Sequence, residues 1–219
     1  MIEKNYYNIK NQLPSHVSLV VVSKTHPASA IQTLYDLGHR DFGENKVQEL
    51  MDKYALLPKD IRWHLIGHLQ TNKVKYIVPF VHLIHSVDSE KLLAEISKQA
   101  QKINRVVELL LQVHIAQEET KFGLSEQELF SLYQQDVLKH YPYVRIRGLM
   151  GMATNTEDER QIRLEFSGLK RLFDQLHSYE ISPHSMDILS MGMSSDYTIA
   201  IEEGSTLVRI GSSILGQRN

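Results

Sequence analysis

The feature that most constrains this chain is a strict alternation, repeated eight times, of short apolar runs with segments of helical periodicity. The runs are rich in β-branched residues and predict strands at 16–24, 41–44, 62–67, 83–87, 106–115, 144–150, 186–190 and 206–210. Strands that alternate with helices form a parallel sheet covered by those helices. Eight such units in 219 residues indicate either a closed (β/α)8 barrel or a doubly wound open sheet.

The first strand-to-helix turn separates these two architectures. It reads SKTHP over residues 23–27 and contains no glycine, so the glycine-rich fingerprint of a dinucleotide-binding open sheet is absent. The chain also has no proline-rich or glycine-rich linker that would mark a domain boundary. The sequence therefore predicts an α/β fold, a single (β/α)8 TIM barrel domain over residues 1–219.

Composition excludes several functional classes. The 24 Lys and Arg against 26 Asp and Glu argue against a partner held through phosphate contacts, such as a nucleic acid. The longest apolar runs, 19–22 and 106–111, fall far short of the roughly 18 residues that a membrane span needs. The start of the chain lacks a signal-peptide pattern, and the absence of cysteine removes disulfides, thiolate metal sites and thiol nucleophiles. We expect a soluble, cytoplasmic protein that binds neither nucleic acid nor membrane.

Lys24 is the first candidate for chemistry. It follows the first predicted strand, and in a barrel the carboxyl ends of the strands form the mouth where active sites lie. A partly desolvated lysine has a lowered pKa, and its neutral amine can form a Schiff base with an aldehyde. The alternative is that Lys24 is simply the first solvated residue of a loop.

The C-terminal segment is a candidate anion site. Gly211 and Ser212 end the last predicted strand and open a helical turn, whose free backbone N–H groups can bind an anion. Barrels frequently hold phosphate between the loops after strands seven and eight. The preceding loop, which includes Ser190 and Gly192, adds hydroxyls and a flexible backbone. The alternative is that these residues only form turns and cap the following helices.

Arg209 lies on the same face of the last predicted strand as Gly211. A guanidinium donates hydrogen bonds and accepts none, so opposite a pyridine nitrogen it would keep that nitrogen unprotonated. The alternative is a salt bridge to Glu202 or Glu203.

The histidines raise the possibility of a metal site, with His64 and His68 four residues apart and His82 and His85 three apart. However, His64 falls in a strand-like run, where a four-residue step does not bring two rings to one ion. The sequence also lacks HExxH and has no carboxylate at ligand spacing beside these histidines. We therefore predict no metal site.

Six segments, in order along the chain, resemble one family. They are VVSKT (21–25), FGENKVQE (42–49), WHLIGHLQTNK (63–73), GLMGMA (148–153), LSMGMSSD (189–196) and VRIGSSILG (208–216). Together they are similar to the pyridoxal phosphate homeostasis proteins, which are relatives of the N-terminal barrel of alanine racemase.

The resemblance implies a cofactor and a set of residues that bind it. Pyridoxal 5′-phosphate (PLP) would be held as an internal aldimine on Lys24, with Arg209 facing the pyridine nitrogen. The phosphate cradle would consist of Gly211 and Ser212 with Ser190 and Gly192. Asn45 resembles a family residue that makes a polar contact at the flank of the cofactor. Lys121 resembles a family lysine that lies near the mouth of the cofactor site.

The resemblance also implies a carrier and regulator of PLP rather than an enzyme, with a part in vitamin B6 and amino-acid homeostasis. Apo forms of PLP-dependent enzymes would be its recipients, and the chain would be a monomer. Racemisation needs a second acid/base on the opposite face of the substrate carbon. In racemases this second acid/base is a tyrosine, which belongs to a further domain. Two alternatives remain open: a PLP-dependent amino-acid racemase or decarboxylase, and a metal-dependent barrel hydrolase built on the histidines.

Overall fold

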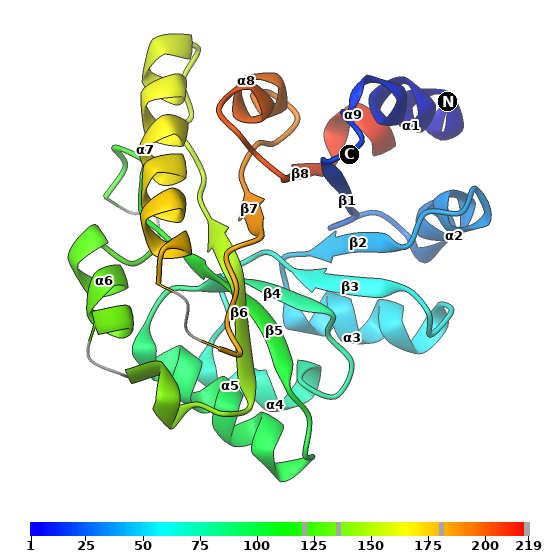
Figure 1. Cartoon of the computed structure of the whole chain (residues 1–219). Coiled ribbons are helices and arrows are strands. Elements are labelled where there is room, and N and C mark those ends of the chain that lie inside the picture. Colours follow the sequence, from blue (N-terminus) through cyan, green and yellow to red (C-terminus); the bar gives the residue numbers. More distant parts are fainter. Residues whose placement is uncertain (120–121, 135–136, 180–181, 217–219) are drawn as a thin grey trace.

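The computed structural model describes residues 1–119, 122–134, 137–179 and 182–216. Eight parallel strands pair in chain order, and β1 also pairs with β8, which closes the barrel (Figure 1). The strands are β1 (Ser18–Val22), β2 (Asp41–Glu44), β3 (Arg62–Leu65), β4 (Leu83–Val87), β5 (Val107–Gln112), β6 (Val144–Met150), β7 (Ile188–Ser190) and β8 (Leu207–Ile210). The predicted TIM barrel is confirmed.

Helices surround the barrel and follow the strands in the predicted order (Figure 1). They are α1 (Ile2–Gln12), α2 (Ala28–Asp36), α3 (Val47–Leu56), η1 (Thr71–Lys73), α4 (Val74–Ile77), α5 (Glu90–Lys102), α6 (Glu126–Gln134), η2 (Val137–His140), α7 (Glu159–His177), α8 (Tyr197–Glu202) and α9 (Ser212–Leu215). Local sequence explains several starts. Asp158 caps α7 through its side chain, and before α6 Ser125 and Glu128 exchange backbone and side-chain hydrogen bonds in a capping box.

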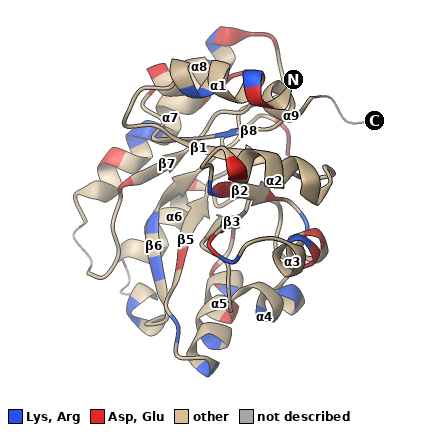
Figure 2. Ribbon diagram, turned by 90° about the vertical axis from the view of Figure 1, so that its right-hand side faces the viewer, with Lys and Arg blue, Asp and Glu red and all other residues tan. Residues whose placement is uncertain are grey.

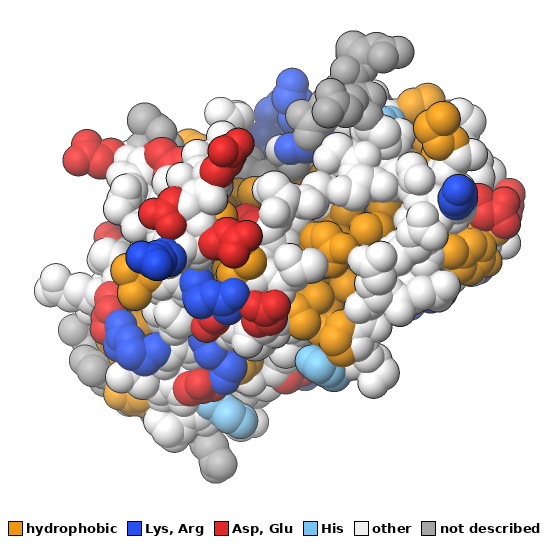
Figure 3. Space-filling view, turned by 90° about the horizontal axis from the view of Figure 1, so that it is seen from above, with side chains coloured by type: hydrophobic (Ala, Val, Ile, Leu, Met, Phe, Trp, Pro, Cys, Tyr) orange, Lys and Arg blue, Asp and Glu red, His pale blue; other side chains and the backbone are white. Residues whose placement is uncertain are grey.

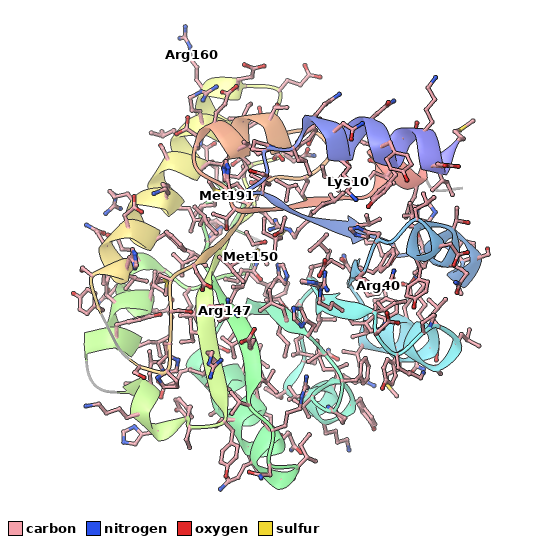
Figure 4. The ribbon with its side chains drawn as sticks, turned by 45° about the vertical axis from the view of Figure 1, so that its right-hand side comes forward. Lys10, Arg40, Arg147, Met150, Arg160 and Met191 are labelled. Atoms are coloured by element: carbon pink, nitrogen blue, oxygen red, sulfur yellow. The ribbon has the colours of Figure 1, made fainter. Side chains whose placement is uncertain are left out.

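Two apolar cores arise from the alternation of side chains along each strand. The larger core lies between barrel and helices and includes Val21, Phe42 and Trp63. The smaller core fills the barrel interior with Val20, Leu83, Leu110, Met150 and Leu207. Figure 4 shows Met150 near the centre of the molecule. Side-chain layers of this kind make a barrel interior a packed core, so a ligand must bind at one end.

The first helix is the element that the strand-and-helix alternation did not predict. Tyr6 and Ile9 are its buried residues, and α1 packs beside α2 and α9 (Figure 1). The Tyr6 hydroxyl lies 3.3 Å from Nδ1 of His39, whose Nε2 lies 2.8 Å from the Asp41 carbonyl oxygen. Because that carbonyl only accepts, Nε2 carries the hydrogen and Nδ1 accepts from Tyr6.

We expect His39 to make the protein less stable in mild acid. Burial lowers the pKa of His39 to about 4, against an ordinary value near 6.5. The unfolded chain therefore takes up this proton first, and stability falls as the pH drops below about 6.5. From pH 7.5 to pH 5 this histidine should remove about 2 kcal/mol of unfolding free energy, measured by urea denaturation.

His39→Gln should reduce this loss, because its amide can still donate to the Asp41 carbonyl but does not titrate. The exposed His16 offers a matched control, since His16→Gln should leave the loss unchanged. An equal loss in wild type and His39→Gln would contradict the assignment.

Charged side chains of both signs are interspersed on the surface, and no large region of one sign appears in Figure 2. Seen from above, acidic and basic groups are mixed over the side of α7 and α8 (Figure 3), where Arg163 pairs with Glu202 and Glu203. Within the described residues, no helix is long and apolar enough to cross a membrane.

The amino end of the barrel is closed by ion pairs. Arg62 pairs with Asp41, and Arg147 bridges Glu108 and Asp187. Figure 2 shows the basic segment of β6 beside the acidic segment of β5, and Figure 4 places Arg147 below Met150.

Candidate functional site

A cavity of about 420 Å³ opens among the loops that follow the carboxyl ends of the strands. Its volume falls within the range of roughly 300–1,000 Å³ that is typical of small-molecule sites. Five of the residues predicted for the site line it, from the ends of the three strands β1, β2 and β8: Lys24, Asn45, Arg209, Gly211 and Ser212. Residues that are distant in sequence therefore meet at the mouth of the barrel, as barrel geometry requires.

Lys24 occupies a rigid turn. It is half-buried at the cavity wall, and the next residue, Thr25, has φ +68°. A β-branched residue in this left-handed region is strained by an amount of order 1–3 kcal/mol, so the surrounding contacts must compensate. The Thr25 amide donates to Glu49 Oε1 at 2.5 Å, which holds the turn in place.

The same turn rests on a buried ion pair. Nζ of Lys53 donates to the Ser23 carbonyl at 2.8 Å and to carboxylate oxygens of Glu44 and Glu49 at 2.7 Å each. The Ser23 hydroxyl donates to Glu44 Oε1 at 2.6 Å. Burial raises the pKa of Glu44 to about 7, although the hydrogen bonds from Lys53 and Ser23 oppose this rise. The residues on both sides of Lys24 are thus fixed by charged hydrogen bonds.

Two backbone amides converge on Ser194, which lines the cavity together with Gly211. Gly211 N and Ser213 N lie 3.3 Å and 3.5 Å from the Ser194 hydroxyl oxygen, so two backbone donors point at one acceptor. A Cβ on residue 211 would lie 3.0 Å from the Val22 carbonyl oxygen. Glycine therefore lets β8 end close to β1 without displacing the Val22 carbonyl. Two convergent N–H groups with serine hydroxyls beside them suit the oxygens of a phosphate.

Arg209 lines the cavity although its side chain is only 3% exposed. Its guanidinium donates to the Ser190 hydroxyl at 2.5 Å and to the Gly151 carbonyl at 3.1 Å. Burial lowers the pKa of Arg209 to about 10, and the charge of Asp196 opposes that change. The group therefore stays charged at neutral pH. The alternative, a salt bridge to Glu202 or Glu203, is not what forms, because both carboxylates pair with Arg163.

Ser190 and Gly192 lie beneath the cavity and do not line it. The Ser190 hydroxyl is fully buried between Arg209 and His85. Gly192 has φ +99°, and a Cβ there would lie 2.7 Å from that of Ala200. Ser194 and Ser195 of the same loop line the cavity in their place.

The sequence reasoning missed several cavity residues. Those with side chains at the wall include Ile66, His68, Gln112, Phe122, Met152, Met193, Ser194 and Ser195. The His68 ring stacks on Phe122 with centroids 3.9 Å apart and also lies 3.1 Å from Asp88. Gln112 ends β5, and its amide donates to the Phe122 carbonyl at 3.0 Å. Their common signal is position, since all of them except Phe122 lie within five residues of the end of a strand. Lys121 lies outside the described residues.

Of the four histidines considered for a metal site, only His68 lines the cavity. His64 and His85 lie inside the barrel, with Nδ1 of His64 2.9 Å from Nε2 of His85. Among the described residues, Asp41, His64 and His82 bring one ligand atom each within 4.8 Å of one another. However, His64 is already hydrogen-bonded to Asp41, and Asp41 is paired with Arg62. This cluster lies at the amino end of the barrel, away from the cavity.

Comparisons with known proteins agree with this geometry. The family model for the N-terminal domain of alanine racemase matches residues 1–219. The pyridoxal phosphate homeostasis protein of Aquifex aeolicus is 43% identical over 203 residues, which cover 91% of this chain and 86% of that protein. The corresponding protein of Helicobacter pylori strain 26695 is 40% identical over 200 residues, or 90% and 86% of the two chains.

Solved structures show the same relationship. PipY of Synechococcus elongatus, determined with PLP bound, is 36% identical with a TM-score of 0.89 over 99% of this chain and 100% of its own. Alanine racemase of Clostridium difficile shares the fold, with a TM-score of 0.79 at 14% identity, and this chain spans 56% of it. From the family model and these relatives, the chain belongs to the alanine racemase N-terminal domain family, among its pyridoxal phosphate homeostasis proteins.

Proposed function

We propose that this protein binds PLP in the cavity at the barrel mouth and carries it as part of vitamin B6 and amino-acid homeostasis. The observation that carries the proposal is the meeting of an amine, a guanidinium and two convergent amides, from Lys24, Arg209, Gly211 and Ser213, around one cavity. The PLP-bound structure of the related PipY supports the identity of the ligand.

Each part of the cavity suits one part of this cofactor. PLP supplies an aldehyde that can bond covalently to an amine, and a pyridine ring that can accept electrons. Lys24 would hold the aldehyde carbon, because the fixed backbone at Ser23 and Thr25 limits where its amine can lie. Arg209 only donates hydrogen bonds, so it would keep the pyridine nitrogen unprotonated.

The phosphate would bind where the amides converge. Gly211 N and Ser213 N, which contact the Ser194 hydroxyl, would donate to phosphate oxygens together with Ser212 and Ser194. Charge-assisted bonds from several donors are stronger than neutral ones. Asn45 lines the same cavity and would contact the flank of the cofactor. Its carbonyl lies so close to Gly67 that a Cβ there would be 2.4 Å from it, which ties the loop after β2 to the loop after β3.

We further propose that the protein binds PLP without turning over amino acids. Racemisation needs acid/base groups on both faces of the substrate carbon. None of the described cavity residues is a tyrosine, and the His68 ring at the wall is stacked on Phe122 and hydrogen-bonded to Asp88. An arginine at the pyridine nitrogen also makes the ring a weak electron sink. The names of the relatives, homeostasis proteins, support this proposal. Incubation with L-alanine followed by chiral analysis tests it, and conversion on the order of 1 s⁻¹ or faster would contradict it.

Saturating PLP is expected to raise the melting temperature. A ligand that binds only the folded state stabilises it by about 2.7 kcal/mol at a hundred times its dissociation constant. That corresponds to a shift of roughly 5–10 °C for a chain of this size. Differential scanning fluorimetry and equilibrium dialysis with PLP measure the two quantities.

Arg209→Gln should reduce the PLP-dependent shift, and Lys46→Ala, at an exposed residue nearby, should preserve it. A PLP-independent melting temperature together with no retention of PLP in dialysis would overturn the proposed function.

The remaining proposals concern the domain extent, the cellular location, the oligomeric state and the partners of the protein. We infer a single barrel domain over residues 1–219, a cytoplasmic monomer, and apo forms of PLP-dependent enzymes as recipients of the cofactor. The half-buried position of Lys24 at an open cavity supports transfer, because a recipient can reach the covalent bond without unfolding the barrel. Sedimentation of the loaded protein with and without an apo enzyme tests both the monomer and the encounter.

A further inference from the structure

A line of hydrogen-bonded side chains crosses the barrel interior from its closed amino end to Arg209. Asp41 Oδ1 lies 3.1 Å from Nε2 of His64, and Nδ1 of His64 lies 2.9 Å from Nε2 of His85. Nδ1 of His85 then lies 3.0 Å from the Ser190 hydroxyl oxygen, which lies 2.5 Å from Nη1 of Arg209. Five residues from five different strands thus form one continuous chain.

The chemistry of the two ends sets the direction of every bond between them. Arg209 can only donate, so the Ser190 oxygen accepts from it and the Ser190 hydrogen is free to be donated to His85. Asp41 forms an ion pair with Arg62, and an ionised carboxylate can only accept, so His64 donates to it from Nε2. With one hydrogen on each imidazole ring, His85 then donates from Nε2 to Nδ1 of His64. In this arrangement both rings carry hydrogen on Nε2 and a lone pair on Nδ1.

Burial makes this arrangement rigid. His64 and Arg209 are each 3% exposed, and His85 and Ser190 are fully buried. Burial, together with the positive charge of Arg209, holds the pKa of His85 well below its ordinary value. A fully satisfied buried network specifies one geometry, because any broken link leaves an unpaired polar group in the interior.

We propose that His85 and His64 are positioning residues for the cofactor site, which fix Ser190 as the acceptor for Arg209 and couple the guanidinium to Asp41 at the opposite end of the barrel. This inference rests on the proposed function, in which Arg209 faces the cofactor ring. The histidines act through Ser190 and Arg209, since neither lies at the wall of the cavity.

Reversing the direction of the hydrogen bonds from Asp41 to Arg209 shows what the histidines contribute. With hydrogen on Nδ1, His85 would donate to Ser190, whose oxygen would then face two donors, His85 and Arg209. The Ser190 hydrogen would need another acceptor inside the barrel, and the bond to Arg209 would weaken. A guanidinium that is less firmly held loses the orientation on which its contact with the ring depends.

The direction of these hydrogen bonds is measurable without any ligand. In ¹⁵N-labelled protein, long-range proton–nitrogen correlation spectra distinguish the nitrogen that carries hydrogen from the one that does not. We expect both His64 and His85 to carry hydrogen on Nε2 at neutral pH. Hydrogen on Nδ1 of His85 would overturn the proposal, whatever the protein binds.

Two variants at one position test the effect on the cofactor. His85→Leu removes the acceptor for Ser190 and should raise the dissociation constant for PLP about tenfold. His85→Asn places an amide oxygen near the position of Nδ1, accepts from Ser190 and should restore affinity to near wild type. A purely structural role would lower the melting temperature of both variants without separating their dissociation constants, and equal constants would overturn the proposal.

A matched pair of carboxylates tests the coupling across the barrel. Asp41 and Asp187 both pair with an arginine at the amino end. Only Asp41 belongs to the line of hydrogen-bonded side chains that leads to Arg209. Asp41→Ala should weaken PLP binding about fivefold and shift the absorption band of the bound cofactor, whereas Asp187→Ala should change neither. Equal effects of the two substitutions would overturn the coupling. Failure of the wild type to bind PLP would instead overturn the proposed function. The spectroscopic test of the hydrogen positions on His64 and His85 would still apply.

Discussion

Lys24→Ala is expected to abolish covalent binding of PLP and to raise its dissociation constant by about a hundredfold. The covalent bond slows release, since PLP can leave only after that bond is broken, and the alanine variant keeps only the contacts to the phosphate and the ring. Spectrophotometric titration measures the loss, because the absorption band of lysine-bound PLP should disappear while a weaker band of free aldehyde remains.

The control for Lys24→Ala is Lys46→Ala, which removes an exposed ammonium near the same cavity and should keep both the band and the affinity. A wild-type absorption band in the Lys24 variant would show that another amine holds the cofactor.

The second large effect concerns stability. Lys53→Met should lower the unfolding free energy by about 3 kcal/mol, since it leaves the fully buried Glu44 carboxylate without its counter-charge. The variant should also bind PLP more weakly, because Lys53 holds the Ser23 carbonyl and the Glu49 carboxylate that fix the Lys24 turn.

The pH dependence of this loss has a definite sign. Burial raises the pKa of Glu44 to about 7, so its stabilising contribution is full below the unfolded pKa near 4.5 and is lost as the pH rises through the folded value. Without Lys53 that pKa should rise further. The destabilisation by Lys53→Met should therefore be larger at pH 8 than at pH 5.5 in urea denaturation.

A double variant provides the control for the buried pair. Glu44→Gln combined with Lys53→Met removes both charges and should recover part of the lost stability. If the double variant were less stable than Lys53→Met alone by the full effect of a separate Glu44 substitution, the two residues would not interact as described.

Much of the fold could be predicted from the sequence, because each βα unit carries its own local signals. The predicted strand at 41–44 coincides with β2, and those at 83–87 and 144–150 coincide with β4 and β6. The exception is α1, whose apolar residues are few and whose stability comes from tertiary contacts such as Tyr6 with His39. Such contacts depend on the closed barrel and have no local signature.

The candidate site was predicted in part for a similar reason. Lys24, Asn45, Arg209, Gly211 and Ser212 all lie at strand ends, and a barrel brings strand ends together. Ser190 also ends a strand, β7, but it does not line the cavity, because a strand-end serine can point up into the mouth or lie below it. The partners of His64 and His85 could not be predicted either, since they come from strands distant in sequence.

Borohydride reduction of the PLP-loaded protein, followed by peptide mapping, tests the central claim most directly. Reduction makes the bond between PLP and its lysine permanent, so mass spectrometry identifies the modified residue. We predict that the principal modified peptide contains Lys24, and that prior incubation with excess phosphate lowers its yield by competition for the amides of Gly211 and Ser213. Modification at another lysine with Lys24 unchanged would contradict the account.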